Sequence, residues 1–184
     1  MTRYALLLRG INVGGVRLAM ADLRRVLAGL GCTEISTLLQ SGNAAVTSDL
    51  TAARLTGRVR DALRDELGLT VPVIVRSATE LTAAIAADPL GDMATDPKRH
   101  LLAFLSDTPG PDRLTALADA VAARQAKNAK DSADSYAVIG AHGYLWCSVN
   151  VHESLFATVN WDRLLGVNVT MRNFATVDKL AALM

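Results

Sequence analysis

The chain has 184 residues, of which 51% are hydrophobic, and a formal net charge of +1. This length and composition suffice for a hydrophobic core and exclude a disordered chain. A net charge near zero provides no global field that attracts nucleic acid or anionic lipid. The apolar runs are too short to span a membrane, and the run between Arg3 and Arg9 is too short for a signal peptide. We therefore expect a cytoplasmic protein with no membrane partner.

The first 76 residues predict the element order β-α-β-β-α-β, which is the ferredoxin-like pattern. Short β-prone runs that end at glycine or turn residues indicate the strands, and apolar residues spaced three or four apart indicate the helices. The strands are expected at Tyr4–Leu8, Glu34–Leu39, Ala44–Thr47 and Val71–Val75, and the helices at Met20–Leu30 and Leu50–Leu67.

Residues 77–99 predict a helix followed by a linker. Ser77 and Glu80 have the spacing of a capping box, in which each side chain bonds the backbone N–H of the other. The helix is expected to end near Ala87, because the residue before a proline is disfavoured in the helical conformation and Asp88-Pro89 follows.

The same element order repeats over residues 100–172. The strands are expected at Leu101–Leu105, Ser135–Ile139, Tyr144–Val149 and Val167–Met171, and the helices at Thr108–Arg124 and His152–Leu165. The polar segment Gln125–Asp134 is expected to be mobile. Tyr4 precedes the hairpin glycine Gly42 by nearly the same distance as Leu101 precedes Gly140. This spacing predicts a structural duplication, although the two halves share no evident residue-level identity.

The predicted fold class is α+β, with two tandem ferredoxin-like βαββαβ units at residues 1–76 and 100–172. The helix and linker at residues 77–99 join them, and a C-terminal helix at residues 173–184 follows. Strands such as Tyr4–Leu8 are apolar continuously, which indicates burial on both faces. Because the helices of such a unit cover one face, we expect the two sheets to pack together or a homodimer to cover the second face.

Three separated motifs carry a family resemblance. They are RGINVGG at residues 9–15, QSGN at residues 40–43 and RNFATVDKL at residues 172–180, accompanied by a Met20-x-x-Leu23 helix start. Together they resemble the domain-of-unknown-function family 1697, a group of uncharacterised bacterial proteins, over essentially the whole chain. The resemblance implies a shared fold and no established activity. The segment Asn150–Ser154 departs from the family pattern, because it lacks the lysine that the resemblance implies there.

The RGINVGG loop and the QSGN hairpin are expected to converge. The first two strands of a βαββαβ unit run parallel, so the loop after the first and the hairpin after the second lie at one end of the sheet. Glycines between a strand and a helix can expose backbone N–H groups to an anion. The loop is neither a Walker A sequence nor a GxGxxG fingerprint. The predicted site for a small anion or nucleotide-like ligand comprises Arg9, Asn12, Gly14, Gly15, Gln40, Ser41 and Asn43.

The same residues also permit a structural interpretation, and the sequence leaves both open. Gly14 and Gly15 allow a tight turn, asparagine and serine side chains satisfy turns, and Arg9 can pair with a carboxylate. Asn173 has the position of an N-cap for the last helix. Capping does not explain Arg172, so we add it to the predicted ligand site as a residue shared between the halves.

The sequence supports no metal site, cofactor or activated nucleophile, and whether the protein is an enzyme stays open. Ser41 lacks a GxSxG elbow. Cys32 and Cys147 have no CxxC spacing and are expected to be free, buried thiols. No ligand spacing for zinc is present among the histidines, which are His100, His142 and His152.

Two further function classes stay open. A nucleic-acid-binding module is the first, because Phe104, Tyr144 and Trp146 lie on the strands where RNA-recognition motifs place base-stacking aromatics. No RNP1 pattern or basic excess accompanies them, and core positions are the competing interpretation. The second is an interaction protein without a small ligand.

Overall fold

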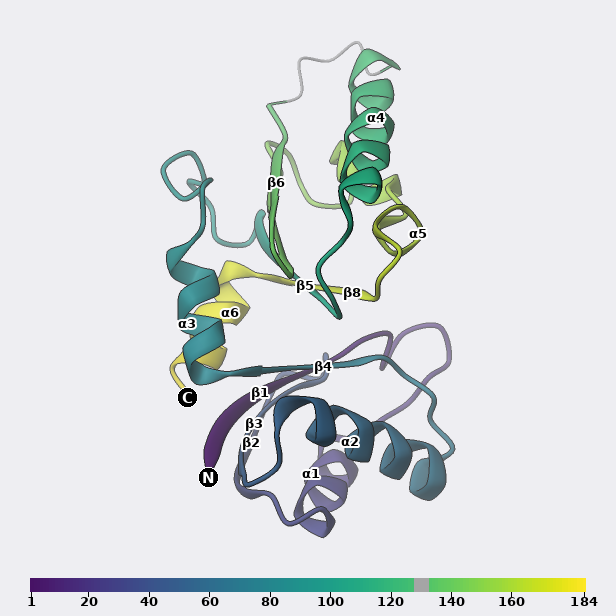
Figure 1. Cartoon of the computed structure of the whole chain (residues 1–184), viewed down its shortest axis with the longest axis vertical. Coiled ribbons are helices and arrows are strands. Elements are labelled where there is room, and N and C mark those ends of the chain that lie inside the picture. Colours follow the sequence, from purple (N-terminus) through teal and green to yellow (C-terminus); the bar gives the residue numbers. More distant parts are fainter. Residues whose placement is uncertain (128–132) are drawn as a thin grey trace. The chain divides into compact units, whose positions relative to one another are not determined.

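The computed structural model describes residues 1–127 and 133–184, which form two compact units (Figure 1). Unit 1 comprises residues 1–86 and 178–184, and unit 2 comprises residues 87–177. The helix of the segment 77–99 thus belongs to unit 1 and the loop after it to unit 2. The chain returns to unit 1 within its last helix.

Unit 1 contains one antiparallel sheet with the strand order β2-β3-β1-β4. Every element expected for the first half is present, with its ends shifted by one or two residues. The elements are β1 (Thr2–Leu8), α1 (Met20–Gly29), β2 (Thr33–Leu38), β3 (Asn43–Ser48), α2 (Ala52–Leu67), β4 (Val73–Ser77) and α3 (Ala78–Ala86).

Helices α1 and α2 lie along one side of this sheet (Figure 1). Leu23 of α1 and Leu55 of α2 are fully buried in one cluster with Leu6 and Leu8 of β1. Alternate residues of a strand point to opposite faces, so the fully buried Ala5 and Leu7 lie on the other face. The continuously apolar strand is therefore buried on both faces, as the sequence predicts.

Helix α3 begins with the expected capping box. The backbone N–H of Ser77 donates to Glu80 Oε2 at 2.7 Å, and the N–H of Glu80 donates to Ser77 Oγ at 3.2 Å. The helix packs against β1 and β4. Leu81 and Ala84 are its buried residues.

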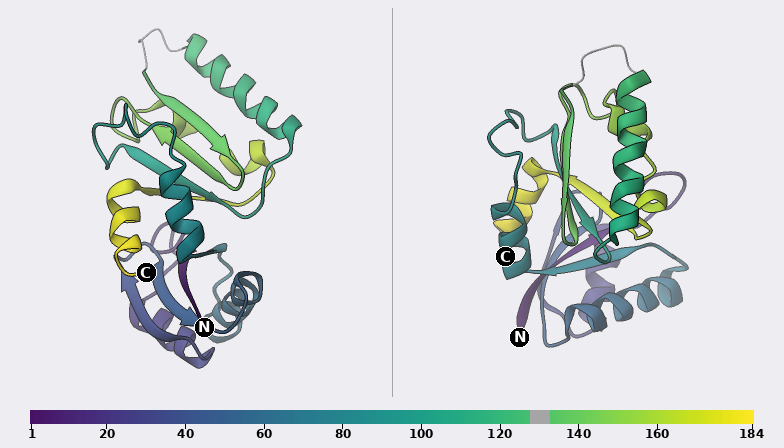
Figure 2. Two further views of the ribbon diagram at one scale, coloured as in Figure 1. Left: turned by 60° about the vertical axis from the view of Figure 1, so that its left-hand side comes forward. Right: turned by 45° about the horizontal axis from the view of Figure 1, so that its top comes forward.

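Unit 2 contains a second antiparallel sheet with the strand order β6-β7-β5-β8, beside which α4 runs (Figure 2). Its elements are β5 (His100–Leu105), α4 (Pro111–Lys127), β6 (Ser135–Ile139), β7 (His142–Trp146), the 3₁₀ helix η1 (Leu155–Thr158), α5 (Trp161–Leu165) and β8 (Val169–Asn173); α6 (Phe174–Ala181) follows.

One expectation for unit 2 is confirmed with a refinement, and another is wrong. Residues 152–165 are mostly helical, as expected, and they form two short helices because Ser154 and Asn160 each accept a backbone N–H and start a helix of their own. Asp134 is not part of a mobile segment, since its side chain is buried and hydrogen-bonded. Of the rest of that segment, Gln125–Lys127 belong to α4 and residues 128–132 lie outside the described residues.

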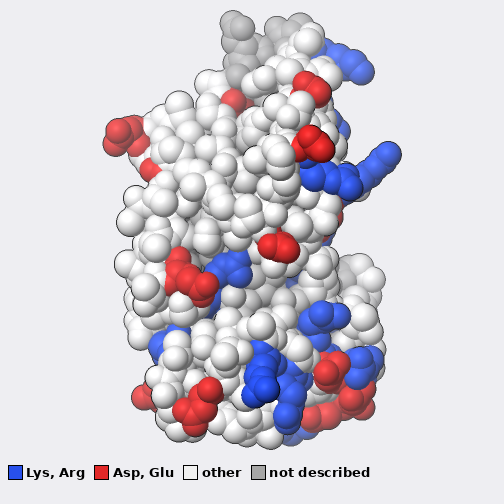
Figure 3. Space-filling view, in the orientation of Figure 1, with Lys and Arg blue, Asp and Glu red and all other residues white. Residues whose placement is uncertain are grey.

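Over the described residues the chain is thus a mixed α+β protein with two four-stranded antiparallel sheets. No helix within residues 1–127 or 133–184 combines the length and the apolar character of a membrane span. On the face in Figure 3, basic and acidic side chains are interspersed among uncharged ones, in keeping with the net charge of +1.

Candidate functional site

The loop after β1 and the hairpin between β2 and β3 converge, as their connectivity predicts. The backbone N–H of Leu8 donates to the Gly42 carbonyl at 2.8 Å, and Asn12 Nδ2 donates to the Gln40 carbonyl at 2.7 Å. Gly42 touches the loop so closely that an added Cβ would lie 2.7 Å from Leu8 Cβ. The two segments form one junction at the end of the sheet.

The half-buried side chain of Asn12 holds the junction together. Besides its bond to Gln40, its Nδ2 donates to the Leu18 carbonyl at 3.1 Å, and its Oδ1 accepts the Leu18 N–H at 3.1 Å. The side chain therefore ties the two ends of the β1–α1 loop together and fastens them to the hairpin. Its polar atoms are engaged within the protein, so Asn12 serves as a structural residue of the junction.

Asn43 has a similar structural role in the hairpin. It is fully buried, and its Nδ2 donates to the Leu38 carbonyl at 3.1 Å and to Ser41 Oγ at 3.0 Å. These bonds close the turn between β2 and β3. The side chains of Asn12 and Asn43 therefore satisfy turns, as the structural interpretation of the sequence predicts.

The other residues predicted for the site lie at the surface of the junction. Arg9, Gly14, Gly15, Gln40 and Ser41 are all exposed. A Cβ added at Gly14 or Gly15 would meet no atom within 4 Å, so the backbone there is open to an approaching group. The junction thus consists of a lock, formed by the half-buried Asn12 and the buried Asn43, and an exposed rim formed by the other five residues.

The rim also contains two exposed apolar side chains next to the residues that the lock joins. Val13 is 62% exposed beside Asn12, and Leu39 is 53% exposed beside Gln40. Leu39 has a φ of 59° and Asn12 a φ of 56°. A positive φ is uncommon outside glycine, and for a leucine it is a costly backbone conformation that the surrounding bonds must hold.

Arg172 belongs to unit 2 and is largely buried. Its Nη1 donates to Thr170 Oγ1 at 2.9 Å and to the Met171 carbonyl at 2.8 Å. Burial lowers the pKa of its guanidinium to about 10. The next residue, Asn173, caps α6 by accepting the Thr176 N–H at 3.0 Å, as its position predicts.

The three aromatic side chains considered for base stacking are buried. Phe104, Tyr144 and Trp146 are exposed by 0%, 1% and 7%. The Arg99 guanidinium lies over the Trp146 ring at 4.9 Å from its centroid. A ring must present a free face to stack on a base, so these three positions provide no base-stacking surface.

Within residues 1–127 and 133–184, no group of three or more His, Cys, Asp or Glu side chains is placed to hold a metal ion. Cys32 and Cys147 are free and buried, and desolvation raises the pKa of both thiols, although hydrogen bonds with serines oppose it. His100 is buried with its Nε2 3.3 Å from Asp88 Oδ2, and its ring stacks on Phe174.

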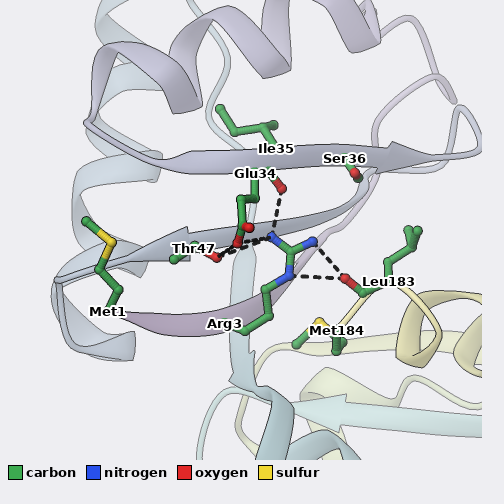
Figure 4. Close-up of a pocket in the computed structure, with 8 residues that line it drawn as sticks. All are labelled: Met1, Arg3, Glu34, Ile35, Ser36, Thr47, Leu183 and Met184. Atoms are coloured by element: carbon green, nitrogen blue, oxygen red, sulfur yellow. Dashed lines mark hydrogen bonds and ion pairs between the residues drawn. The ribbon is translucent and has the colours of Figure 1, made fainter.

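The sequence interpretation missed a groove in unit 1 that lies around Arg3, at the start of β1 (Figure 4). The sequence contains one sign of this groove: the charged Arg3 directly precedes the apolar run Tyr4–Leu8 of the same strand. The sequence interpretation also missed the carboxylate of Asp134, whose partners lie on later segments of unit 2.

The profile of the family described as Protein of unknown function (DUF1697) matches residues 1–133 of the chain. The chain belongs to this family. It is also similar to a solved structure, that of the conserved bacterial protein SP0830 from Streptococcus pneumoniae. That similarity has a TM-score of 0.70 and 26% sequence identity, and it covers 99% of this chain and 98% of that chain. No curated protein is significantly similar to the chain.

The DUF1697 match includes both loops of the junction, whereas Arg172 lies beyond it. The family that the sequence motifs indicate is therefore confirmed, with the motifs at residues 9–15 and 40–43 inside the match and the motif at residues 172–180 beyond it. Neither the family description nor the description of the similar structure states an activity. A function for this DUF1697 protein must therefore be argued from its own residues.

The Asn12→Ala variant is expected to lose about 2 kcal/mol of unfolding free energy, because three hydrogen bonds disappear and alanine tolerates the positive φ poorly. Urea denaturation followed by circular dichroism measures this loss. In Asn12→Gly the backbone conformation is unstrained, so the remaining loss reports the hydrogen bonds together with the greater freedom of glycine in the unfolded chain. Unchanged stability in both variants would contradict the role of Asn12 as the lock.

Proposed function

We propose that this DUF1697 protein binds a small anionic or nucleotide-like molecule at the rim of the junction between the β1–α1 loop and the β2–β3 hairpin. The contact residues in this proposal are Arg9, Gly14, Gly15, Gln40 and Ser41. Asn12 and Asn43 hold the two segments in place without touching the ligand. The observation that carries the proposal is the Asn12 lock, which fixes the loop while its glycine backbone and Arg9 remain exposed.

The chemistry of the rim suits an anionic group. Gly14 and Gly15 have φ values of 57° and 91°, and their exposed backbone allows close approach by phosphate or carboxylate oxygens. Arg9 at the start of the loop and Arg17 near its end are both exposed and add positive charge. Gln40 and Ser41 supply neutral donors from the hairpin. Because the lock keeps this arrangement in place, little ordering is needed on binding.

Thermal denaturation with inorganic phosphate and with adenosine monophosphate tests the proposal. A ligand that binds only the folded chain raises the denaturation midpoint. Arg9→Gln is expected to weaken binding about tenfold or more, because a charge-assisted hydrogen bond contributes roughly 1.5–3 kcal/mol. Arg58→Gln on the exposed surface of α2 is the matched control and should bind as the unmodified chain does.

The outcome also separates this proposal from the structural interpretation. If neither ligand raises the midpoint of the unmodified chain, and Arg9→Gln only melts earlier, the junction is structural and the site is absent. A ligand effect that persists in Arg9→Gln would place the site elsewhere.

A second candidate function is an interaction protein without a small ligand, and the exposed apolar side chains of Val13 and Leu39 favour it. Burial of these two side chains against a partner would remove apolar surface from water. The homodimer stays a prediction within this candidate. The double variant Val13→Ser, Leu39→Ser should then dissociate an oligomer seen in analytical ultracentrifugation of the unmodified chain. If the unmodified chain is monomeric in this experiment, the homodimer prediction is wrong.

We also propose that both units are ferredoxin-like and arose by duplication. Equivalent strands have the same order in the two sheets. The hydrogen bond from the Leu8 N–H to the Gly42 carbonyl, at 2.8 Å, has a counterpart in unit 2. There the Leu105 N–H donates to the Ala141 carbonyl at 3.0 Å. The hydrogen bond from the Arg9 N–H to the Pro72 carbonyl, at 3.0 Å, likewise corresponds to the bond from the Ser106 N–H to the Asn168 carbonyl, at 2.9 Å.

The ends of the two sheets also support duplication at the level of residues. Arg76 and Arg172 each lie one position before the residue that caps the next helix, Ser77 for α3 and Asn173 for α6. Both arginines are largely buried, and burial lowers the pKa of both. An experimental structure with a different strand order in either unit would contradict the proposal.

The free thiols of Cys32 and Cys147 are in keeping with the proposed cytoplasmic location.

A further inference from the structure

A groove of about 660 Å³ lies within unit 1 around the side chain of Arg3 (Figure 4). Glu34 of β2 and Thr47 of β3 line it on the side of the sheet. Leu183 and Met184, which follow α6, line it on the other side, and Met1 lies at one end. The groove is at the start of β1, whereas the junction loop follows the other end of that strand.

The guanidinium of Arg3 is fixed in this groove by the sheet. Arg3 lies directly opposite Thr47 in the pairing of β1 with β3. Its Nη1 donates to the Glu34 carbonyl at 2.7 Å and to Thr47 Oγ1 at 3.4 Å, and the side chain is 19% exposed. These contacts leave the opposite edge of the guanidinium, formed by Nε and Nη2, directed at the segment after α6.

That edge binds a single neutral oxygen. Both Nε and Nη2 donate to the Leu183 carbonyl, at 3.1 and 2.7 Å. The two parallel N–H groups on this edge of an arginine match the two oxygens of a carboxylate, which they bind in a bidentate, charge-assisted pair. One carbonyl oxygen takes both bonds without supplying the charge or the second oxygen that this edge accommodates.

We propose that the groove around Arg3 is a binding site for a molecule with a carboxylate group, and that the Leu183 carbonyl holds the position of that carboxylate. A carboxylate that replaces this carbonyl makes two parallel charge-assisted bonds in place of two bonds to a neutral oxygen. This site is independent of the anion site proposed at the junction.

The charges around the groove favour a carboxylate over a phosphate. Glu34 Oε2 lies 3.8 Å from Arg3 Nη1 and accepts the Thr47 hydroxyl at 2.6 Å. A nearby negative charge disfavours an incoming dianion more strongly than a monoanion, because the repulsion grows with the ligand charge. A phosphate monoester is largely dianionic above its second pKa, about 6, whereas a carboxylate carries one charge.

The segment at residues 182–184 can leave the groove without unfolding the sheet. The N–H groups of Leu183 and Met184 donate to the carbonyls of Leu180 and Ala181 in α6, so this segment continues the helix end. Arg3 connects it to β1. Exchange of the Leu183 carbonyl for a carboxylate therefore breaks the bonds to Arg3 and leaves the bonds between Arg3, Glu34 and Thr47 in place.

Methyl NMR of the methionines reports the site directly. The chain has five methionines, of which Met1 and Met184 line the groove, Met20 of α1 is in the core of unit 1, and Met93 and Met171 lie in unit 2. The probes are acetate and N-acetyl-leucyl-methionine, which has a free carboxylate. At pH 7.5 both probes are expected to shift the Met1 and Met184 methyl signals in a saturable way. The C-terminal amide of the same dipeptide and equimolar phosphate should leave them unchanged.

Variants separate binding from structure. Arg3→Gln should abolish the shifts, and Arg3→Lys should weaken binding at least several-fold, since lysine keeps the charge and lacks the paired N–H groups. A chain that ends at Ala181 lacks the competing carbonyl and should bind the dipeptide about tenfold more tightly, followed at Met1. Arg64→Gln on the exposed side of α2 is the control for loss of an arginine.

Each outcome decides the proposal. Saturable shifts that need Arg3, that persist in Arg9→Gln and that strengthen in the shortened chain support it. If the shortened chain is folded and neither probe shifts Met1, the site does not exist and Arg3 only anchors the segment after α6. Shifts that depend on Arg9 and persist in Arg3→Gln would overturn this inference and leave the junction site standing.

Discussion

The Asp134→Ala variant is expected to lose about 3 kcal/mol or more of unfolding free energy in unit 2. The buried carboxylate accepts Ser148 N–H and Oγ–H at 2.7 Å each, Ser154 Oγ–H at 2.6 Å and Leu155 N–H at 3.0 Å. The substitution removes the acceptor of these four hydrogen bonds, and each buried polar group that is left unsatisfied costs roughly 1–3 kcal/mol. Both tryptophans, Trp146 and Trp161, lie in unit 2, so urea denaturation followed by tryptophan fluorescence measures the loss.

The matched control is Asp119→Ala on the exposed side of α4, which should change the stability by less than about 0.5 kcal/mol. Equal effects of the two substitutions would show that the Asp134 carboxylate does not hold β7 and η1 together.

The same carboxylate makes unit 2 sensitive to acid. Burial by itself raises the pKa of Asp134, but the hydrogen bonds from Ser154, Ser148 and the Leu155 N–H outweigh it, and the pKa is lowered. A carboxyl whose pKa is lower in the folded than in the unfolded state stabilises the fold above its unfolded-state pKa, about 3.9. This contribution is lost as the pH falls through the folded-state pKa.

The stability difference between the unmodified chain and Asp134→Asn should therefore be constant above about pH 5 and shrink below about pH 4. A difference that grows toward low pH would have the wrong sign for a lowered pKa.

The Gly42→Ala variant is expected to lose about 2–4 kcal/mol, because it combines a strained backbone with a steric clash. Gly42 has a φ of 77°, and an added Cβ would lie 2.7 Å from Leu8 Cβ and 2.9 Å from Ile11 Cδ1. Relief of the clash must move the hairpin away from the loop. Hydrogen exchange of the β1 and β3 amides measures the loss of unfolding free energy in unit 1. The amides of the junction should also exchange faster than in the unmodified chain.

Gly68→Ala provides the control for backbone strain alone. Gly68 ends α2 with a φ of 66°, and an added Cβ there meets no atom within 4 Å. This variant should lose only about 1 kcal/mol. If Gly42→Ala costs no more than Gly68→Ala, the close approach of the hairpin to the loop does not constrain the fold.

The junction illustrates how far the sequence leads toward a site. Connectivity alone predicts that the RGINVGG loop and the QSGN hairpin meet, and the bond from Asn12 to the Gln40 carbonyl confirms it. The sequence does not reveal the direction of each side chain, because loops have no periodicity that assigns faces. Asn12 and Asn43 therefore look the same in the sequence as Arg9 and Ser41, although the first two side chains hold the two segments together and the other two are exposed at the rim.

Local chemistry determined the elements themselves. The capping box of Ser77 and Glu80, the strand Ser135–Ile139 and the cap of α6 by Asn173 all follow from residues within a few positions of one another. Residues 152–165 are mostly helical, as the sequence predicts, and capping by Ser154 and Asn160 divides the helical residues into two short helices.

The sequence by itself therefore determined the order of strands and helices, the α+β class, the family and the meeting of the two loops. Tertiary structure alone decided the contacts that connect distant positions. Arg3 reaches the Leu183 carbonyl across 180 positions, and Asp134 reaches Ser154 across 20. Periodicity and turn chemistry act over a few residues, so they carry no information about such pairs. The pairs form only when packing brings donors and acceptors from distant positions together, since a buried polar group must be satisfied wherever its partner lies in the chain.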